Sequence, residues 1–151
     1  MAGYKDTSSS DAVYMLDWYA YGIGKVPAKV ATTYQNISDA WSLLIDQKWH
    51  DRITAIKAND GGLSYVEFFE YRKNKMSIPL FNIYCATGSN REYYAERTDL
   101  IQLGQTTQAI YFAKLTNEGE QSELALTGDE IKARFSLVKP GVEQLRNHQT
   151  P

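Results

Sequence analysis

Residues 53–71 read ITAIKANDGGLSYVEFFEY, two runs of mostly apolar residues on either side of Asn59-Asp60-Gly61-Gly62. Aromatic and β-branched side chains suit strands, and the Asp-Gly-Gly sequence supplies the positive φ angles of a tight hairpin turn. We therefore predict a hairpin of strands 53–58 and 63–71. The odd positions of the second strand are mostly apolar, and Val66 and Phe68 interrupt that alternation. The interruption indicates a bulge, or cover on both faces.

Two further segments, residues 78–87 and 109–116, are apolar at both odd and even positions. Such strands are typical of the centre of a sheet that helices cover. Pro79 then fits only at a strand start, because proline cannot donate to the ladder. The segments predict an α+β fold with a single, mostly antiparallel sheet and about two helices packed on it. A three-layer α/β/α sandwich is the alternative.

Two capping boxes mark the expected helices. Ser89 and Glu92 predict a short helix that ends near residue 98, and Thr127 and Glu130 predict a longer one that stops before Pro140. The apolar residues of the second helix recur on one face, at Ile131, Phe135 and Val138.

The remaining segments set the domain limits. Residues 1–12 are polar and Ser-rich, which predicts a disordered lead or tether, and residues 141–151 form a polar C-terminal tail. Residues 13–140 are expected to form a single α+β domain. Within it, residues 13–21 and 41–46 fit a strand and a helix equally well.

Composition argues against several classes of function. A net charge of −2 and a pI near 5.7 do not favour nucleic-acid binding, which needs a concentrated field of Lys and Arg. No run of 18 apolar residues occurs, so membrane attachment is expected only through an N-terminal anchor that has been removed. Aromatic residues make up 13% of the chain, with 11 Tyr among them. Tyrosine suits the margin of a sheet or a recognition surface.

The sequence offers no catalytic set, no cofactor motif and no metal-ligand cluster. His50 and His148 are the two histidines, in a turn and in the polar tail. Ser136 and Lys139 have the spacing of a Ser-Lys acylase, but Ser136 is expected near a helix end rather than at a helix start. Cys85 lies in an apolar run and is expected to be a buried structural residue.

The chain resembles a group of uncharacterised lipoprotein-type domains of Gram-positive bacteria, usually found in extracytoplasmic or lipid-anchored proteins. The resemblance covers residues 37–140 and rests on spaced aromatic and aliphatic positions. These are Trp49 in a turn, the Asn59-Asp60-Gly61-Gly62 hairpin, Leu80-Phe81-Asn82-Ile83-Tyr84, Leu103-Gly104, Ala109-Ile110-Tyr111-Phe112-Ala113 and a last helix from Thr127. It implies an exported, compact α+β domain and transfers no catalytic residue.

These observations predict a non-enzymatic binding or interaction domain, exported and associated with the cell surface. Its partner would be a protein, a peptide or a cell-envelope component. A cytoplasmic regulatory or immunity-type partner protein is the alternative, and an enzyme of unknown class comes third. The expected recognition surface combines Trp49 with Tyr93 and Tyr94. Adjacent helix positions point about 100° apart, so one of the two tyrosine rings should leave the core face.

Overall fold

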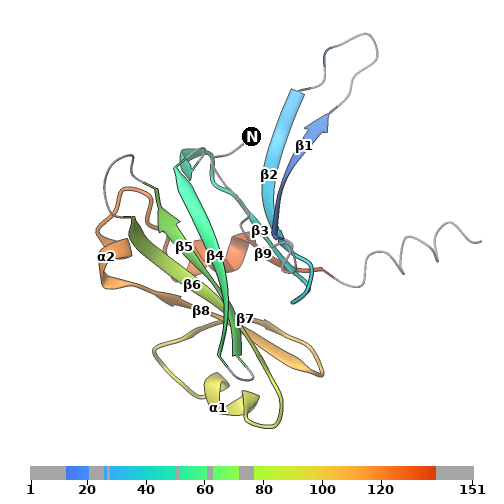
Figure 1. Cartoon of the computed structure of the whole chain (residues 1–151), viewed down its shortest axis with the longest axis vertical. Helices are drawn as coiled ribbons and strands as arrows, with labels where there is room; N and C mark the ends of the chain where they lie inside the picture. The colour runs from blue at the N-terminus through green and yellow to red at the C-terminus, as the bar shows by residue number, and fades with distance from the viewer. Residues whose placement is uncertain are drawn as a thin grey trace, which may run out of the picture.

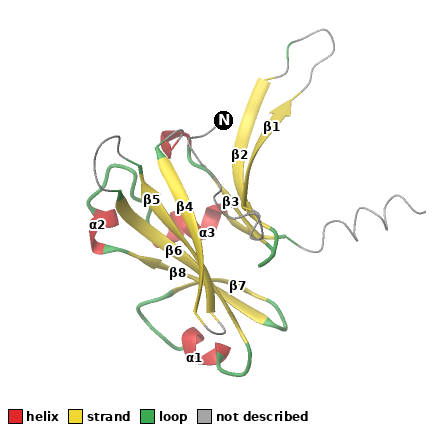
Figure 2. Ribbon diagram, in the orientation of Figure 1, coloured by secondary structure: helices red, strands yellow, loops and turns green. Residues whose placement is uncertain are grey.

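The computed structural model describes residues 13–20, 26, 28–49, 52–60, 63–71 and 77–138, and its strands form two antiparallel sheets (Figures 1 and 2). The antiparallel, strand-rich character was predicted, but the prediction of a single sheet covered by about two helices is wrong. The alternative of a three-layer α/β/α sandwich is wrong as well, since the second layer is itself a sheet.

The larger sheet has five strands in the order β4-β5-β6-β8-β7. Their bounds are Ile53–Asp60 (β4), Leu63–Glu70 (β5), Ile78–Thr87 (β6), Ala109–Leu115 (β8) and Ile101–Gln105 (β7). All four predicted strands are therefore confirmed. The hairpin register places Asp60 opposite Leu63, as a two-residue turn requires, while Gly61 and Gly62 lie outside the described residues. The expected irregularity of the second strand is a register shift between Phe68 and Phe69.

The smaller sheet has four strands in the order β1-β2-β3-β9. Their bounds are Val13–Ala20 (β1), Ala28–Asn36 (β2), Trp41–Leu44 (β3) and Phe135–Leu137 (β9). The two ambiguous segments are thus both strands. β3 pairs with β2 only over residues 33–36, so the β1–β2 hairpin continues past β3 and projects from the body of the molecule (Figure 1).

The helices are short, and the last of them contacts strands of both sheets (Figure 2). They are η1 (Gln47–Trp49), α1 (Arg91–Ala95), α2 (Asn117–Glu120) and α3 (Gly128–Arg134). Both capping bonds of the Thr127 box are present. The Ser89 box is absent, because Asn90 takes the N-cap position without a side-chain bond, and α1 stops at Ala95 rather than near residue 98. No helix of the described segments is long and apolar enough to cross a membrane.

The end of α3 differs most from its prediction. The helix stops at Arg134, and Phe135 begins β9, where it pairs with Leu43 of β3. Phe135 is still buried, so the apolar side chain that fits a helical period also fits a strand that closes the smaller sheet.

The main core lies between the two sheets. Its largest rings are in contact with one another, in a chain through Tyr34, Trp41, Phe68, Phe81 and Trp49. Val66 and Phe68 of β5 are fully buried, so the even positions of this strand face the core and the odd positions face outward. The two residues that interrupt the apolar pattern of the odd positions are therefore the core residues.

Candidate recognition surface

The outward face of the five-stranded sheet carries an aromatic row built by strand register. Tyr65 of β5 is paired with Tyr84 of β6, which is paired with Phe112 of β8. Paired residues of an antiparallel sheet point to the same side, so the three rings stand next to one another across three strands. Their neighbours Val66 and Ile83 are fully buried on the other side, which places the three rings on the face away from the main core.

Helix α1 extends this row by two rings. The Tyr94 ring stacks on Phe112 at a centroid distance of 5.4 Å and an interplanar angle of 18°, and Tyr93 meets Tyr94 edge to face at 5.4 Å. The strand rings are as close, at 5.2 Å for Tyr65–Tyr84 and 5.1 Å for Tyr84–Phe112. We call these five residues, Tyr65, Tyr84, Phe112, Tyr94 and Tyr93, the aromatic row.

Exposure is lowest in the middle of the row and highest at its α1 end. Tyr65 and Tyr84 are half-buried, Phe112 is 2% exposed, Tyr94 is half-buried and Tyr93 is 64% exposed. The stacked rings cover part of one another's faces, and Tyr84 and Tyr94 pack against the buried Phe112, so Tyr93 is the ring most open to solvent.

Helix α1 is too short to be stable by itself and is positioned by its surroundings. Gly88 before it has a φ of 87°, a conformation that glycine adopts without strain. The Arg91 guanidinium donates to the Gly88 carbonyl at 2.8 Å and to the Thr107 carbonyl at 3.1 Å. These bonds tie the helix to the β7–β8 turn, and the Tyr94 ring ties it to the sheet.

The predicted recognition residues are not all together. Trp49 is fully buried, and its indole N–H donates to the Leu124 carbonyl at 2.7 Å inside the core. The prediction that Trp49 belongs to an exposed patch is therefore wrong. The indole ring can be buried because its one N–H group has a hydrogen-bond partner inside the core. Tyr93 and Tyr94 do behave as their adjacency implied, with one ring packed and the other in solvent.

A polar row runs beside the aromatic one. Glu67 of β5, Asn82 of β6 and Lys114 of β8 are paired across the same outward face. The Asn82 side-chain amide donates to the Tyr84 hydroxyl at 3.0 Å, which connects the two rows. An aromatic centre with a polar margin is the usual make-up of a protein interface.

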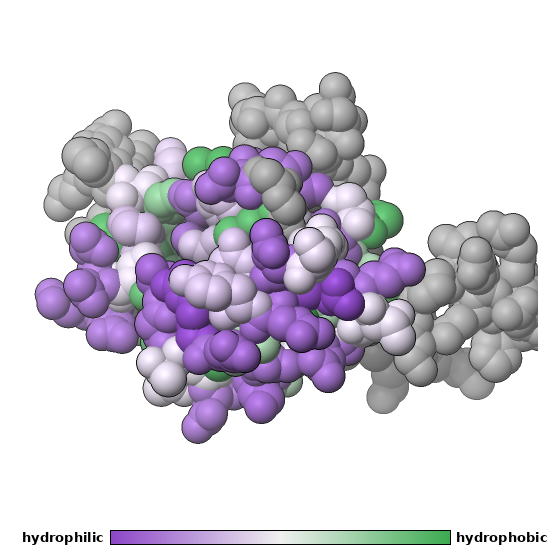
Figure 3. Space-filling model, turned by 90° about the horizontal axis from the view of Figure 1, so that it is seen from below, coloured by the Kyte–Doolittle hydropathy of each residue, from purple (hydrophilic) through white to green (hydrophobic). Residues whose placement is uncertain are grey.

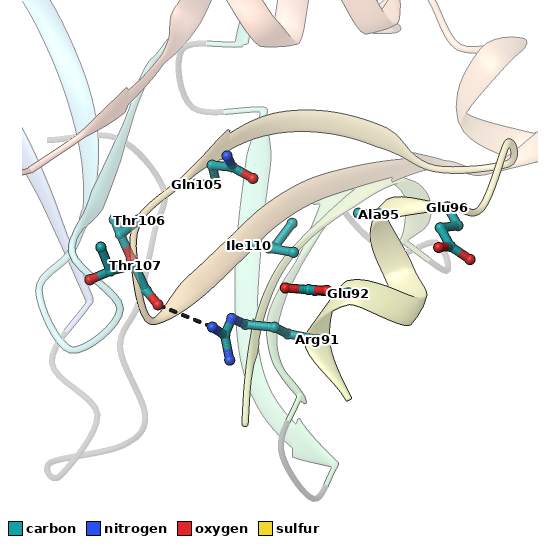
Figure 4. Close-up of a pocket in the computed structure, with 8 residues that line it drawn as sticks. All are labelled: Arg91, Glu92, Ala95, Glu96, Gln105, Thr106, Thr107 and Ile110. Carbon is teal, nitrogen blue, oxygen red and sulfur yellow. Dashed lines mark hydrogen bonds between the residues drawn. The ribbon is translucent and has the colours of Figure 1, made fainter. Parts of the chain in front are cut away.

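A hollow of about 430 Å³ lies at the end of the row, between α1 and the β7–β8 turn (Figure 4). Its lining is mostly polar: Arg91, Glu92, Ala95, Glu96, Gln105, Thr106, Thr107 and Ile110. Glu92 and Ile110 point toward its centre, Arg91 reaches across to Thr107, and Glu96 points away (Figure 4). This end of the molecule is largely hydrophilic (Figure 3). The hollow therefore offers hydrogen bonds rather than an apolar pocket.

A second polar cluster lies between the sheets and has a structural role. Asp39, in the β2–β3 turn, accepts a hydrogen bond from the Ser64 hydroxyl at its carboxylate and one from Tyr111 at its carbonyl, the latter at 2.7 Å. Burial, and next the charge of Asp39, raise the pKa of the Cys85 thiol to about 11. Burial, and next Cys85, also raise the pKa of Tyr111. Neither group is an activated nucleophile, since activation requires a lowered pKa.

The other chemistry-bearing residues form no site among the described residues. No group of three or more potential metal ligands occurs in that part of the chain. Ser136 lies in β9 and is exposed, so it is not at the helix start that a Ser-Lys acylase needs. His50, Lys139 and His148 lie outside the described residues.

Comparison of the chain with protein-family models, with curated proteins and with solved structures found no match. The resemblance to exported domains of Gram-positive bacteria therefore stays a prediction. Sequence reasoning found Tyr93 and Tyr94 but missed the three strand rings. Only the pairing register shows that Tyr65, Tyr84 and Phe112 are neighbours, and the register across three strands is a non-local property.

Proposed function

We propose that the chain is a non-enzymatic binding domain, exported and presented at the cell surface, which contacts its partner through the aromatic row. The observation that carries this proposal is the continuity of the five rings, ending in a Tyr93 that is 64% exposed. Rings that remain exposed beside polar residues are enriched at interfaces, and tyrosine is among the residues that contribute most binding energy there.

The geometry of the rings favours a protein or peptide partner over a glycan. A sugar ring stacks on an open aromatic face, but the interplanar angles of 14° and 18° within the row show that these faces cover one another. What the row presents instead is the half-buried Tyr65, Tyr84 and Tyr94 and the exposed Tyr93, with Glu67, Asn82 and Lys114 alongside. Such a strip suits the mixed apolar and polar surface of another polypeptide.

The test uses the full chain immobilised on a sensor and two defined probes from Gram-positive cells. One probe is purified peptidoglycan sacculi, and the other is detergent-solubilised envelope protein. We expect saturable binding to the protein fraction. Tyr93→Ala should weaken it by roughly tenfold or more, the effect expected of an interface hot spot.

Tyr71→Ala is the matched control. Tyr71 is 55% exposed, comparable to Tyr93, and makes no ring contact with the aromatic row. If the partner binds to the aromatic row, Tyr71→Ala should retain full affinity. Equal losses in both variants, or saturable binding to neither probe, would contradict the proposed function. Binding to sacculi alone would refute the preference for a polypeptide partner.

A further inference from the structure

The two edges of the five-stranded sheet are treated differently by the fold. The β7 edge is five residues long and irregular, with a register shift between Gln102 and Gly104. The side chains of Phe135 and Leu137 lie against Gly104, and α3 contacts β7 as well. A short, bulged and covered edge is the usual protection against pairing with another chain.

The β4 edge has none of these protections among the described residues. It is eight residues long, contains no proline, and pairs with β5 without a register shift. In the part of the chain that the structure describes, no strand pairs with its other side. Ile56, in the middle of β4, is 53% exposed. A long, regular edge with an exposed aliphatic residue is a template for a further strand.

The direction of the backbone groups on β4 follows from its first bond to β5. The Tyr71 N–H donates to the Arg52 carbonyl at 2.7 Å, so position 52 is bonded toward the partner strand. Hydrogen-bonding direction alternates along an antiparallel strand, so even positions of β4 bond to β5. The odd positions therefore direct their backbone groups to the open edge; they are Ile53, Ala55, Lys57 and Asn59. Ile56 would occupy a non-hydrogen-bonded pair there.

We propose that β4 pairs antiparallel with β4 of a second copy of this chain, with the two-fold axis at Ile56. In this register Ile53 lies opposite Asn59 of the second copy and Ala55 lies opposite Lys57, so all four of the hydrogen-bonding positions meet. Ile56 lies opposite its own copy, in the close pairing geometry that brings side chains together.

Charge complementarity supports this register. The two-fold axis places Arg52 opposite Asp60 of the second copy, once at each end of the paired strands. Arg52 keeps 43% of its side chain exposed while it contacts Glu123, and Asp60 is exposed. Moving the axis by one residue toward the C-terminus would instead place Lys57 opposite Lys57, and like charges directly opposite one another are destabilising. Moving it by one residue toward the N-terminus would place Arg52 opposite Ala58, so both ion pairs would be lost. A second copy is therefore a better match than an unrelated strand that lacks these charges.

The contact would be small, because one strand edge forms it. Interfaces below about 1,000 Å² are generally weak or transient, so we expect a dissociation constant in the range of roughly 1 to 100 μM.

Sedimentation velocity on the full chain tests the proposal over a concentration series through this range. We expect a monomer–dimer equilibrium. Ile56→Lys should weaken dimerisation at least about tenfold, because it places two like charges at the two-fold axis. Gln102→Lys introduces the same charge on the opposite edge strand and is the control, with no expected change. Thermal midpoints of both variants check that they are folded.

A charge exchange tests the register itself. Asp60→Arg and Arg52→Asp should each abolish self-association, because each places like charges at both ends of the paired strands. An equimolar mixture of the two variants should recover dimers, since Arg52 then meets Asp60, and the new Arg meets the new Asp. The Arg52 variant also loses its contact with Glu123, so its stability is measured separately.

Three results would overturn the proposal: a monomer at every concentration, a dimer indifferent to Ile56→Lys, or no recovery in the mixture. If β4 pairs with a peptide from another protein instead, the chain is a monomer at every concentration, which is the first of these results. The aromatic row is not part of this contact, so the outcome is independent of the proposed binding function.

Discussion

Gly119→Ala should destabilise the fold, although helix propensity alone predicts the opposite. Gly119 lies in α2 and is buried against β6. A Cβ atom at this position would lie 2.2 Å from the Leu80 carbonyl oxygen, 2.6 Å from the Leu80 Cα and 2.6 Å from the Thr116 Oγ1. Two of these are backbone atoms of a core strand, which cannot rotate away as the end of a flexible side chain can.

The magnitude follows from what must move. The Leu80 carbonyl accepts hydrogen bonds from the Thr116 backbone N–H at 3.3 Å and from the Thr116 hydroxyl at 3.0 Å, so separating α2 from β6 weakens both. Overpacking costs about 1–3 kcal/mol and a lost hydrogen bond about 1 kcal/mol, while alanine in place of glycine returns about 1 kcal/mol of helix propensity. We expect a net loss of about 1–3 kcal/mol. For a domain of this size that lowers the thermal midpoint by about 2–12 °C.

Gly128→Ala is the matched control. Gly128 opens α3, and a Cβ atom there would meet the Ile101 side chain, with its Cδ1 at 2.6 Å. Ile101 is partly exposed and can change rotamer, so we expect a stability within about 1 kcal/mol of the parent. Thermal and urea unfolding, followed by circular dichroism, measure both variants. A Gly119→Ala midpoint equal to or above that of the parent would refute the steric reasoning.

Two further predictions concern the α3 cap and Cys85. Thr127→Ala should cost about 1 kcal/mol in urea unfolding, because the Thr127 hydroxyl accepts from the Glu130 N–H; an unchanged unfolding midpoint would contradict that role. The Cys85 pKa is raised from 9.0 to about 11, so an unfolded thiol ionises before the folded one as pH rises. The neutral Cys85 thiol therefore contributes fully to the free energy of unfolding below about pH 9. This contribution falls by at most about 2–3 kcal/mol between pH 9 and 11. Cys85→Ala should flatten this part of the stability–pH curve, so that only the pH dependence due to Tyr111 remains. An identical slope in the variant and the parent would show that the thiol does not cause the pH dependence.

Local signals in the sequence predicted most elements of the larger sheet. The two strands predicted on either side of residues 59–62 pair, with Asp60 opposite Leu63, and the segment at 78–87 has the same bounds as β6. The Thr127 capping box was also correct, because its two bonds join residues three positions apart. Each of these features depends on neighbours in the chain, where turn chemistry and residue type act directly.

The second sheet depends on contacts that no local pattern records. Phe135 fits a helical repeat with Ile131, yet it pairs with Leu43 of β3, more than 90 residues earlier. Phe135 can be buried equally well in a helix or in a strand. The strand forms because β3 has an open side with which Phe135 can pair. Trp49 shows the same limit at the candidate site, since its partner Leu124 is 75 residues away. Without that contact, an aromatic residue in a turn appears available for recognition.

The aromatic row and the β4 edge belong to one sheet, and this has a consequence for binding. Strand pairing continues a sheet in its own plane, so a dimer through β4 would put both outward faces on the same side of one ten-stranded sheet. Each row begins at Tyr65 on β5, the strand next to the paired edge, and ends at Tyr93 on the far side. Two rows would then face one partner surface, and a weak contact at each would gain from the high effective concentration of the other. Ile56→Lys, which leaves the row itself intact, should therefore reduce binding to a multivalent envelope surface while binding to a single soluble partner is unchanged. If Ile56→Lys binds both targets as tightly as the parent chain does, the two surfaces act independently.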